Sequence, residues 1–431
     1  MSDYSEQTPG LDIKEAIAEA KRCLNCAKPQ CKAGCPIENN IPEFIAQLAK
    51  GNMGEAHRFI AEKSNLPAVC GRVCAHELQC EGHCILGKKD KKIQVGRLER
   101  FVADFDYNMG LTVDSIKPKT RGKVAVIGSG PAGLTVAGDL AKDGFNVTVY
   151  EAQAEPGGVL LYGIPAFRLP KDVVRREIAR IESRGVNFIT GRTAGKDFTV
   201  EDLFADGYDA IFIGSGTALS RDLDIPGKEL IGIVQSSYFL RMNALLAAGQ
   251  IEPDDIPLRL GDTVLVIGAG NVGMDAARTA ARMGADSVTV VAREAEEHMP
   301  ALKAEYEGAV LDGVKFLWET TPNAYVGEGR VTGLSVTAES GERVLGANKI
   351  FLAVGARPAN RIVSTTSGIE VDENGYVISK TRPYGMTTRK GVFAGGDVVH
   401  RPATVVLAMK EAKKVAQGIE AYVDAIKLLD L

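Results

Sequence analysis

Two copies of one short pattern constrain the fold of this chain more than any other feature. In each copy an apolar strand runs into three spaced glycines, and a helix and a second strand follow. The first copy comprises Val124–Ile127, Gly128-Ser-Gly130-Pro-Ala-Gly133, a helix to Lys142 and Val147–Tyr150. The second comprises Val264–Ile267, Gly268-Ala-Gly270-Asn-Val-Gly273, a helix to Met283 and Val288–Ala292. A strand, helix and strand in this order form a parallel β-α-β unit, so the sequence predicts an α/β fold with two such domains.

The three glycines of each copy have separate expected tasks. The first makes the turn from strand to helix, the second lets the backbone approach a pyrophosphate, and the third lets helix and strand pack closely. The free N–H groups of the helix then face the phosphates. We therefore expect a dinucleotide at each copy; the alternative is a tight turn without a ligand. The expected contacts are Gly128, Gly130, Pro131, Ala132 and Gly133 at the first site, and Gly268, Gly270, Asn271, Val272 and Gly273 at the second.

The residue after the second strand of each copy indicates which dinucleotide binds. Glu151 follows the first, and a carboxylate there accepts hydrogen bonds from ribose hydroxyls, which suits FAD or NAD. Arg293 follows the second, and a cation there suits the 2′-phosphate of NADP. Glu294 comes next and no second arginine supports Arg293, so NAD stays open as the alternative.

A motif near the C-terminus assigns the first site to a flavin. Gly391-Val-Phe-Ala-Gly-Gly396-Asp397 is an apolar strand that ends in glycines and an acid, as in flavoproteins with two dinucleotide domains. There such an Asp meets the ribityl and phosphate region, and the helix after Thr404 points its N-terminus at the isoalloxazine. The alternative is a solvated turn. The stretch from Ala353 through Gly355 to Pro358 marks the return from the nicotinamide domain, which makes the flavin domain discontinuous and places Gly355 at the nicotinamide nucleotide.

All eight cysteines lie in the first 84 positions. They form the runs Cys23-x2-Cys26-x4-Cys31-x3-Cys35-Pro36 and Cys70-x3-Cys74-x5-Cys80-x3-Cys84, with short helices expected at 11–22, 41–49, 54–63 and 95–105. The N-terminus has no basic and apolar leader, so we expect a reducing, cytoplasmic location, where disulfides are rare. Clustered cysteines there indicate inorganic iron and sulfide; zinc and disulfides are the alternatives.

Bulk properties exclude several classes of function. A length of 431 residues predicts two or three domains. The net charge of −4 gives no basic surface for nucleic acid, and no apolar run is long enough to span a bilayer. No Ser/His/Asp or HExxH pattern occurs. His57, His298 and His400 carry no motif, and His76 and His83 are expected on exposed loops.

The motifs follow one another in an order typical of a known family. After the cysteine runs come Gly96-Arg-Leu-Glu99-Arg-Phe101, the first glycine triplet, Pro156-Gly-Gly158, Tyr162-Gly-Ile-Pro165-x-Phe167-Arg168-Leu169 and the second triplet. The series resembles the small (beta) subunit of NADPH-dependent glutamate synthase. It is equally similar to the N-terminal half of dihydropyrimidine dehydrogenase and to the large subunit of NADH-dependent ferredoxin:NADP oxidoreductase.

The resemblance implies an architecture and a set of ligands. It implies an α-helical domain at 1–119 with two 4Fe–4S clusters, an FAD-binding domain at 120–230 and 357–431, and an NAD(P)-binding domain at 231–356, the last two of glutathione-reductase type. One cluster is assigned to Cys23, Cys26, Cys31 and Cys84, and the other to Cys35, Cys74, Cys80 and Glu99, which leaves Cys70 spare. The alternative for Glu99 is a carboxylate on a helix surface. Gly158 and Arg168 are assigned to the flavin, with a surface ion pair as the alternative for Arg168.

The resemblance also implies a function. Hydride passes from NADPH to flavin N5, and single electrons then pass through the clusters to a larger partner subunit; the cofactors carry the chemistry, so no catalytic acid or base is expected. A glutamate synthase partner is the first choice, and a pyrimidine-reducing or ferredoxin:NADP system is the alternative. A disulfide reductase needs a redox cysteine pair near the flavin, yet no cysteine follows Cys84. A non-catalytic redox sensor would not need the intact second triplet.

Overall fold

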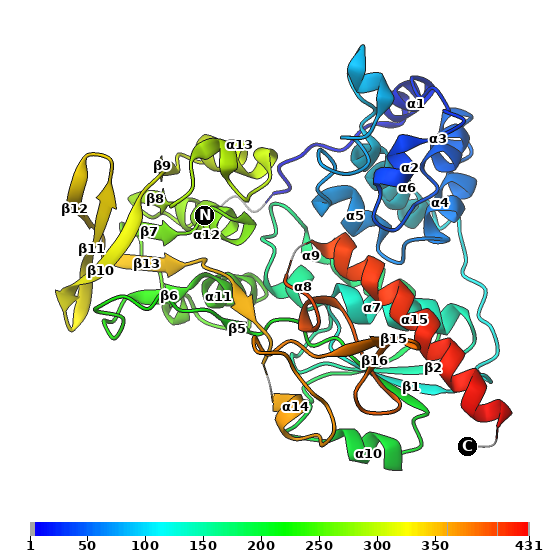
Figure 1. Cartoon of the computed structure of the whole chain (residues 1–431). Helices are drawn as coiled ribbons and strands as arrows, with labels where there is room; N and C mark the ends of the chain where they lie inside the picture. The colour runs from blue at the N-terminus through cyan, green and yellow to red at the C-terminus, as the bar shows by residue number, and fades with distance from the viewer. Residues whose placement is uncertain (1–4, 360, 403, 430–431) are drawn as a thin grey trace. The chain divides into compact units, whose positions relative to one another are not determined.

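The computed structural model describes residues 5–359, 361–402 and 404–429 of the chain (Figure 1). Residues 1–4 of the predicted domain 1–119, and residues 360, 403 and 430–431 of the predicted segment 357–431, lie outside the described residues. The chain divides into two compact units. Unit 1 comprises Met1–Ser5, Leu161–Phe167 and Leu219–Ala356, and unit 2 comprises Glu6–Leu160, Arg168–Ala218 and Arg357–Leu431.

Unit 2 begins with a bundle of short helices around the cysteines. They are α1 (Ile13–Lys21), α2 (Gln30–Gly34), α3 (Ile41–Ala49), α4 (Met53–Ala61), α5 (Pro67–Val73), the 3₁₀ turn η1 (Ile85–Lys88) and α6 (Val95–Met109). Asp12 starts α1 with a capping box, and left-handed Gly110 ends α6, which runs four residues beyond its predicted end. Phe44, Ile60 and Leu98 are fully buried in the core of this bundle. The four predicted helices are confirmed.

The rest of unit 2 is built on a seven-stranded sheet, ordered β15-β16-β17-β4-β1-β2-β3. Its strands are β1 (Lys123–Ile127), β2 (Asn146–Tyr150), β3 (Asn187–Ile189), β4 (Ala210–Ile213), β15 (Ser379–Thr381), β16 (Tyr384–Thr387) and β17 (Val392–Ala394). The helices are α7 (Pro131–Lys142), α9 (Lys171–Ser183), α10 (Val200–Ala205), α14 (Arg361–Ser364) and α15 (Val405–Leu428), with the 3₁₀ turn η4 (Gly396–Val398). The central strands are parallel, and both faces are covered, because their residues are almost all buried.

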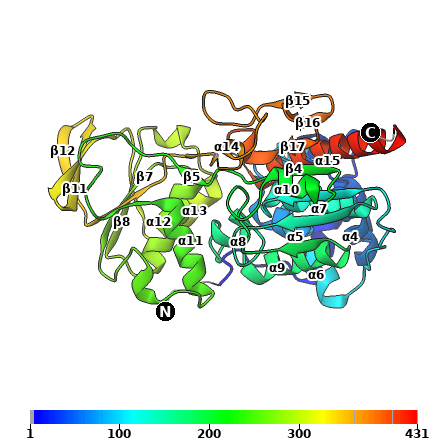
Figure 2. The ribbon, with the colours of Figure 1, turned by 90° about the horizontal axis from the view of Figure 1, so that it is seen from below.

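Unit 1 contains a five-stranded parallel sheet ordered β6-β13-β7-β8-β9. These strands are β6 (Ile233–Gln235), β7 (Thr263–Ile267), β8 (Ser287–Val291), β9 (Lys315–Leu317) and β13 (Lys349–Leu352), and a separate antiparallel sheet holds β10 (Thr321–Glu328), β11 (Arg330–Ala338) and β12 (Gly341–Gly346). The helices are α11 (Ser236–Ala247), α12 (Asn271–Arg282) and α13 (Lys303–Leu311), which lie side by side in Figure 2.

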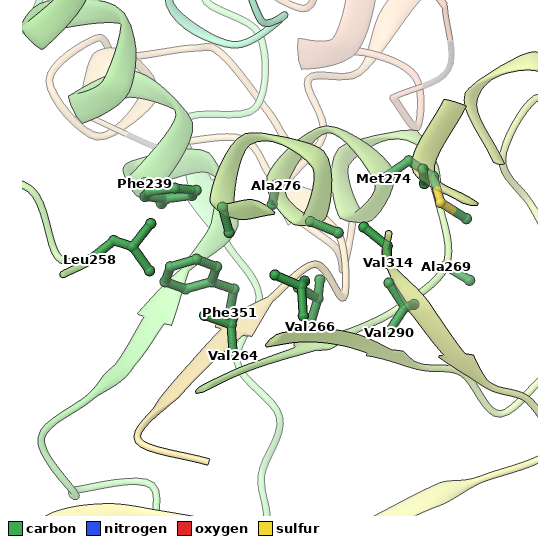
Figure 3. Packing of buried hydrophobic residues seen from close by; sticks show 14 of the residues in the cluster. Phe239, Leu258, Val264, Val266, Ala269, Met274, Ala276, Val290, Val314 and Phe351 are labelled. Atoms are coloured by element: carbon green, nitrogen blue, oxygen red, sulfur yellow. The ribbon is translucent and has the colours of Figure 1, made fainter. Parts of the chain in front are cut away.

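Two apolar layers sandwich the five-stranded sheet of unit 1. On one face Val264, Val266 and Phe351 of the strands pack against Phe239 of α11 and Met274 of α12 (Figure 3). On the other face strand residues pack against the antiparallel sheet through a core that includes Leu334 and Val336. Both predicted β-α-β units are therefore confirmed. Each predicted strand or helix end lies within one residue of the observed end.

The remaining short elements are α8 (Val159–Tyr162), β5 (Leu219–Ser220), β14 (Ala356–Arg357) and the 3₁₀ turns η2 (Pro253–Asp255) and η3 (Glu296–His298). Among the described residues, no helix combines the length and the apolar character needed to cross a membrane.

Candidate functional site

The first glycine triplet forms an open cradle at the start of α7. Gly128 has φ +96°, a left-handed conformation that favours glycine. A methyl group on Gly133 would overlap the carbonyl oxygen of Gly128, so α7 and β1 pack in contact there. A methyl group on Gly130, by contrast, would meet no protein atom within 4 Å. The only open position of the three is therefore the one at which a pyrophosphate has to approach the backbone.

The second triplet repeats this geometry in unit 1. Gly268 has φ +110°, and a methyl group on Gly273 would overlap the Gly268 carbonyl oxygen. Around Gly270 there is again no protein atom within 4 Å of an added methyl group. Both cradles leave room for a diphosphate beside the free N–H groups of a helix start, so the residues present fit a bound dinucleotide at each.

Glu151 is held at the first cradle by Ser129, which lies between the first two glycines of the triplet. Ser129 donates to a carboxylate oxygen of Glu151 through its backbone N–H at 3.0 Å and its hydroxyl at 2.5 Å. The same hydroxyl accepts from the N–H of Gly157 at 2.9 Å. Glu151 is 7% exposed, and Gln153 N–H donates to its other oxygen at 2.8 Å. Ser129 thus fixes the carboxylate relative to the Gly157–Gly158 turn.

The other predicted flavin residues of unit 2 converge on the same cradle. A methyl group on Gly158 would come within 2.8 Å of the Gly130 Cα, and one on Gly396 within 2.8 Å of the Ala132 Cβ. These contacts bring three segments that are distant in sequence to the start of α7, where Pro131 is the first residue of the helix. Asp397 follows Gly396, and burial raises its pKa to about 6.

Two further residues predicted to contact the flavin, Thr404 and Arg168, belong to unit 2. Thr404 is the N-cap of α15, and its hydroxyl accepts from the N–H of Leu407 at 3.4 Å, so α15 begins where the sequence predicts. Arg168 is half-buried.

The predicted nicotinamide residues follow adjacent parallel strands of unit 1. Gly268 comes after β7, Arg293 after β8, and Gly355, with φ +99°, after β13. Parallel strands end at one edge of a sheet, which is where ligands of such sheets bind. Arg293 is exposed.

The first turn of α12 completes this edge of the unit 1 sheet. The side chain of Asn271 is held by the chain itself, because its Oδ1 accepts from Leu302 N–H at 3.0 Å. Val272 is 48% exposed beside it.

The first cysteine group, which we define as Cys23, Cys26, Cys31 and Cys84, lines one cavity. The other side chains of its wall are mostly apolar, among them Leu24, Ile41, Ile45, Ile85 and Ile93. Burial raises the pKa of Cys31 to about 11. Buried thiols of this kind keep their protons until a cation replaces them, and iron is a cation that binds thiolate strongly. The donor set and its apolar wall fit an iron–sulfur cluster.

The second cysteine group, which we define as Cys35, Cys74 and Cys80 with Glu99, is more deeply enclosed. Electrostatic interactions connect Glu99 to all three thiols. Glu99 is 7% exposed, so the alternative of a carboxylate on a helix surface is wrong. The Asn39 Nδ2 donates to the Glu99 carboxylate at 3.2 Å. Burial, together with the charge of Glu177, raises the pKa of Glu99 to about 8.

Cys70 and His76 lie beside the second cysteine group. Cys70 is 2% exposed, and its thiol is hydrogen-bonded to Cys74. His76 was expected on an exposed loop, which is wrong: its Nε2 atom is buried, and a methyl group on Gly96 would overlap the imidazole. Burial lowers the His76 pKa to about 4. His83 is exposed, as expected.

All eight cysteines lie within the described residues, and all are free thiols. Over the described ranges, no three His, Cys, Asp or Glu side chains converge closely enough to hold a single metal ion. A cubane cluster spaces its ligands more widely than one ion does. The ligand roles of the two groups stay predictions.

Comparison with known proteins identifies the family. Residues 1–111 match the family described as dihydropyrimidine dehydrogenase domain II, 4Fe-4S cluster, and residues 122–412 match pyridine nucleotide-disulphide oxidoreductase. The glutamate synthase [NADPH] small chain of Halomonas elongata is 37% identical over 95% of this chain and 91% of its own. This chain belongs to the glutamate synthase small-chain family. It is accordingly an NAD(P)H-dependent flavin and iron–sulfur oxidoreductase that carries FAD, NAD(P) and a 4Fe–4S centre.

Other similar proteins are named as subunits of a different enzyme. The NAD-dependent dihydropyrimidine dehydrogenase subunit PreT of Escherichia coli O157:H7 is 38% identical over 97% of both chains. Among solved structures, FprA of Mycobacterium tuberculosis in complex with NADPH has a TM-score of 0.58 at 19% identity, covering 73% of this chain and 86% of its own. That likeness shows the fold of the two dinucleotide domains.

Sequence reasoning missed several residues that organise the site. The sequence showed Ser129 only as the residue between the first two glycines of the first triplet, although it positions Glu151. Asn39 and Glu177, which act on the second cysteine group, carry no motif. Glu177 is 97 or more positions from any cysteine of this group, and its role follows from packing alone.

Proposed function

We propose that this chain is the electron-input subunit of a larger enzyme. It takes electrons from NADPH at the second cradle and delivers them one at a time, through two 4Fe–4S clusters, to a partner subunit of glutamate synthase type. When bound, FAD accepts a hydride and releases single electrons, which is the conversion that joins a nicotinamide to iron–sulfur centres.

One observation supports this function most strongly. The second cysteine group and the flavin cradle belong to the same compact unit, and the helix α5 beside that group contacts helices of the flavin-binding part. The Cys70 thiol lies 3.6 Å from Met409 Sδ of α15, the helix that begins at Thr404. Glu177 of α9 accepts from Ala68 N–H at 2.7 Å and so caps α5, the helix that carries Cys70. Electron transfer between a flavin and a cluster needs a short and constant separation, which these buried contacts favour.

The side chains of the chain would bind and orient rather than react. Glu151 and Ser129 would hold the adenosine ribose, and the first turn of α7 would hold the pyrophosphate. Arg293 would hold the 2′-phosphate at the second cradle. The first cysteine group and the second would hold one cluster each, with Glu99 as an oxygen ligand of the second. Asn39 would orient Glu99 through its hydrogen bond.

The experiment uses the purified chain with its cofactors. We expect NADPH to reduce artificial dyes at a rate that does not depend on glutamine or 2-oxoglutarate, and we expect no glutamate. Adding the partner that co-purifies from the native cell should start glutamate formation from the same NADPH. Glutamate formation by the isolated chain would contradict the subunit assignment, and so would the absence of any NADPH-driven dye reduction.

A second candidate is the input subunit of a pyrimidine reductase. The specific observation in its favour is the exposed Arg293, followed by Glu294 and without a second arginine, because such a pocket would also suit NADH. If NADH is the better donor and the co-purified partner reduces uracil or thymine, this candidate replaces glutamate synthase.

A further inference from the structure

The cavity of the first cysteine group opens beside a cluster of lysines. A second cleft of unit 2 is lined by Lys88, Lys91 and Lys92. Cys84, Ile85 and Gln30 line both this cleft and the cysteine cavity, so the two adjoin. A charged surface therefore begins directly at a predicted cluster ligand.

Exposed apolar side chains lie at the same opening. Leu24 is 59% exposed and Ile85 is 40% exposed, and both line the cysteine cavity. Single exposed apolar residues are common, but apolar residues edged by charged ones at the mouth of a site are typical of a protein contact. We call Leu24, Ile85, Lys88, Lys91 and Lys92 the exit surface.

The lysines of the exit surface outnumber the acids of the same cleft. The three lysines are exposed, and none of them forms a salt bridge with any residue of the described ranges. Two acids, Asp90 and Glu81, also line this cleft. Asp90 pairs with Arg22 at 3.2 Å and Glu81 accepts from Gly96 N–H at 3.0 Å, while Lys91 and Lys92 act on them electrostatically without forming a salt bridge. Positive charge thus gathers here on a chain whose net charge is −4.

From this juxtaposition we propose that the exit surface is the docking site of an acidic electron-accepting protein. The proposal rests on the proposed function and names the place where electrons leave the chain. The lysines would steer the acidic partner toward the cavity, and Leu24 and Ile85 would make the dry contact. Opposite charges at the edge of such a contact raise the association rate about 10- to 1,000-fold at low salt.

The test uses two small haem proteins of opposite charge as one-electron acceptors: acidic cytochrome b5 and basic cytochrome c. Each NADPH oxidised to NADP⁺ and a proton reduces two ferric haems to ferrous. At low salt we expect the loaded chain to reduce cytochrome b5 with the higher kcat/KM, and we expect this preference to fade as salt rises.

The decisive variant carries Lys88→Glu, Lys91→Glu and Lys92→Glu. We expect kcat/KM to fall at least about tenfold for cytochrome b5 and to rise for cytochrome c. A change in cluster potential would instead shift both acceptors in the same direction. The control reverses three exposed lysines elsewhere, Lys196, Lys380 and Lys390, for an equal change in net charge, and it should behave like the parent chain.

Binding without turnover gives a second measurement. Calorimetry at low salt, without NADPH, should detect cytochrome b5 binding to the parent chain and to the control but not to the exit-surface variant. The docking proposal is wrong if the exit-surface variant and the control show the same kcat/KM and binding. It is also wrong if kcat/KM for both acceptors changes in the same direction. If no variant reduces any acceptor although iron and flavin are bound, the proposed function fails instead.

Discussion

The two cradles predict that neighbouring glycines of one triplet fail in different ways when each gains a methyl group. The pair to compare is Gly270→Ala and Gly273→Ala in unit 1. The two positions are three residues apart at the start of α12. Gly270 has φ −81° and ψ 175°, which any residue adopts, and its added methyl group meets no protein atom within 4 Å. At Gly273 the methyl group overlaps the Gly268 carbonyl oxygen and lies 3.1 Å from the carbonyl carbon.

The expected magnitudes follow from these contacts. At Gly270 alanine is a poorer helix cap than glycine but restricts the unfolded chain more, so the free energy of unfolding should change by less than about 1 kcal/mol. At Gly273 the obstacle is backbone and cannot rotate away. The helix must move off β7, which disturbs the core around Met274 and costs on the order of 3 kcal/mol.

Nucleotide affinity should distinguish the two variants as well, because the variant that keeps its stability, Gly270→Ala, is the one that obstructs the nucleotide. A methyl group at Gly270 fills the space that the pyrophosphate needs and blocks approach to the backbone N–H groups. Losing even one hydrogen bond to a charged phosphate costs about 1.5–3 kcal/mol, which is roughly tenfold or more in Kd. Gly270→Ala should therefore be a stable chain that binds NADPH poorly.

The chain contains a single tryptophan, Trp318, which lies in unit 1 and stacks on Phe316 with ring centroids 5.4 Å apart. Its fluorescence during urea unfolding thus reports on this unit. With a urea dependence of about 2 kcal/mol per molar, Gly273→Ala should lower the midpoint by roughly 1.5 M, and Gly270→Ala by less than about 0.5 M. Calorimetry with NADPH then measures the Kd of the stable variant. Equal losses of stability, or an unchanged Kd for Gly270→Ala, would refute the assignment of tasks to these glycines.

Three further predictions concern other sites. Arg293→Ala should raise the KM for NADPH at least about tenfold and leave that for NADH within about twofold; equal effects on both would remove the preference for NADPH. Cys70→Ala should keep its iron, whereas Cys35→Ala should lose about half of it, as measured by iron analysis; iron loss in the first would overturn the ligand assignment. Burial and Arg180 lower the pKa of His57 to about 4, so the unfolded state takes up the proton first as pH falls below about 6.5. Between pH 7 and 5 the parent chain should lose roughly 2 kcal/mol more stability than His57→Gln, and parallel pH profiles would contradict this.

Local patterns of the sequence were sufficient to predict most of the fold. The strands at Val124 and Val264 and the tasks of the glycines depend on neighbours in the chain, because turn geometry and strand-to-helix packing are local. Burial of Glu99 and His76 was not predictable in this way. Gly96 accommodates the His76 imidazole, and Asn39 reaches Glu99 from 60 positions away, so both depend on tertiary packing.

The motif from Tyr162 to Leu169 shows the same limit. The sequence presents it as one continuous family motif, of which Arg168 was assigned to the flavin, yet the two compact units divide it between Phe167 and Arg168. Phe167 lies beneath the guanidinium groups of Arg278 and Arg282, at 4.6 and 4.4 Å from the ring centroid. A cation–π contact with residues more than a hundred positions away leaves no local signal.

The two compact units correspond to two steps of the proposed function, electron transfer in unit 2 and nucleotide exchange in unit 1. Within unit 2, Arg180 donates to His57 and Asp106, and Arg184 donates to Asn65 at 2.7 Å, so the flavin-binding part is joined to the cysteine bundle by buried polar contacts. Breaking such a contact costs several kcal/mol, because it leaves a buried charge unpaired. Under the proposed ligand assignment, these contacts would hold the distance between flavin and clusters constant. The nicotinamide cradle belongs to the other unit, where the nucleotide must enter and leave in every turnover. On the proposed function, the chain would keep the electron path rigid and confine exchange of NADPH to a unit with its own core.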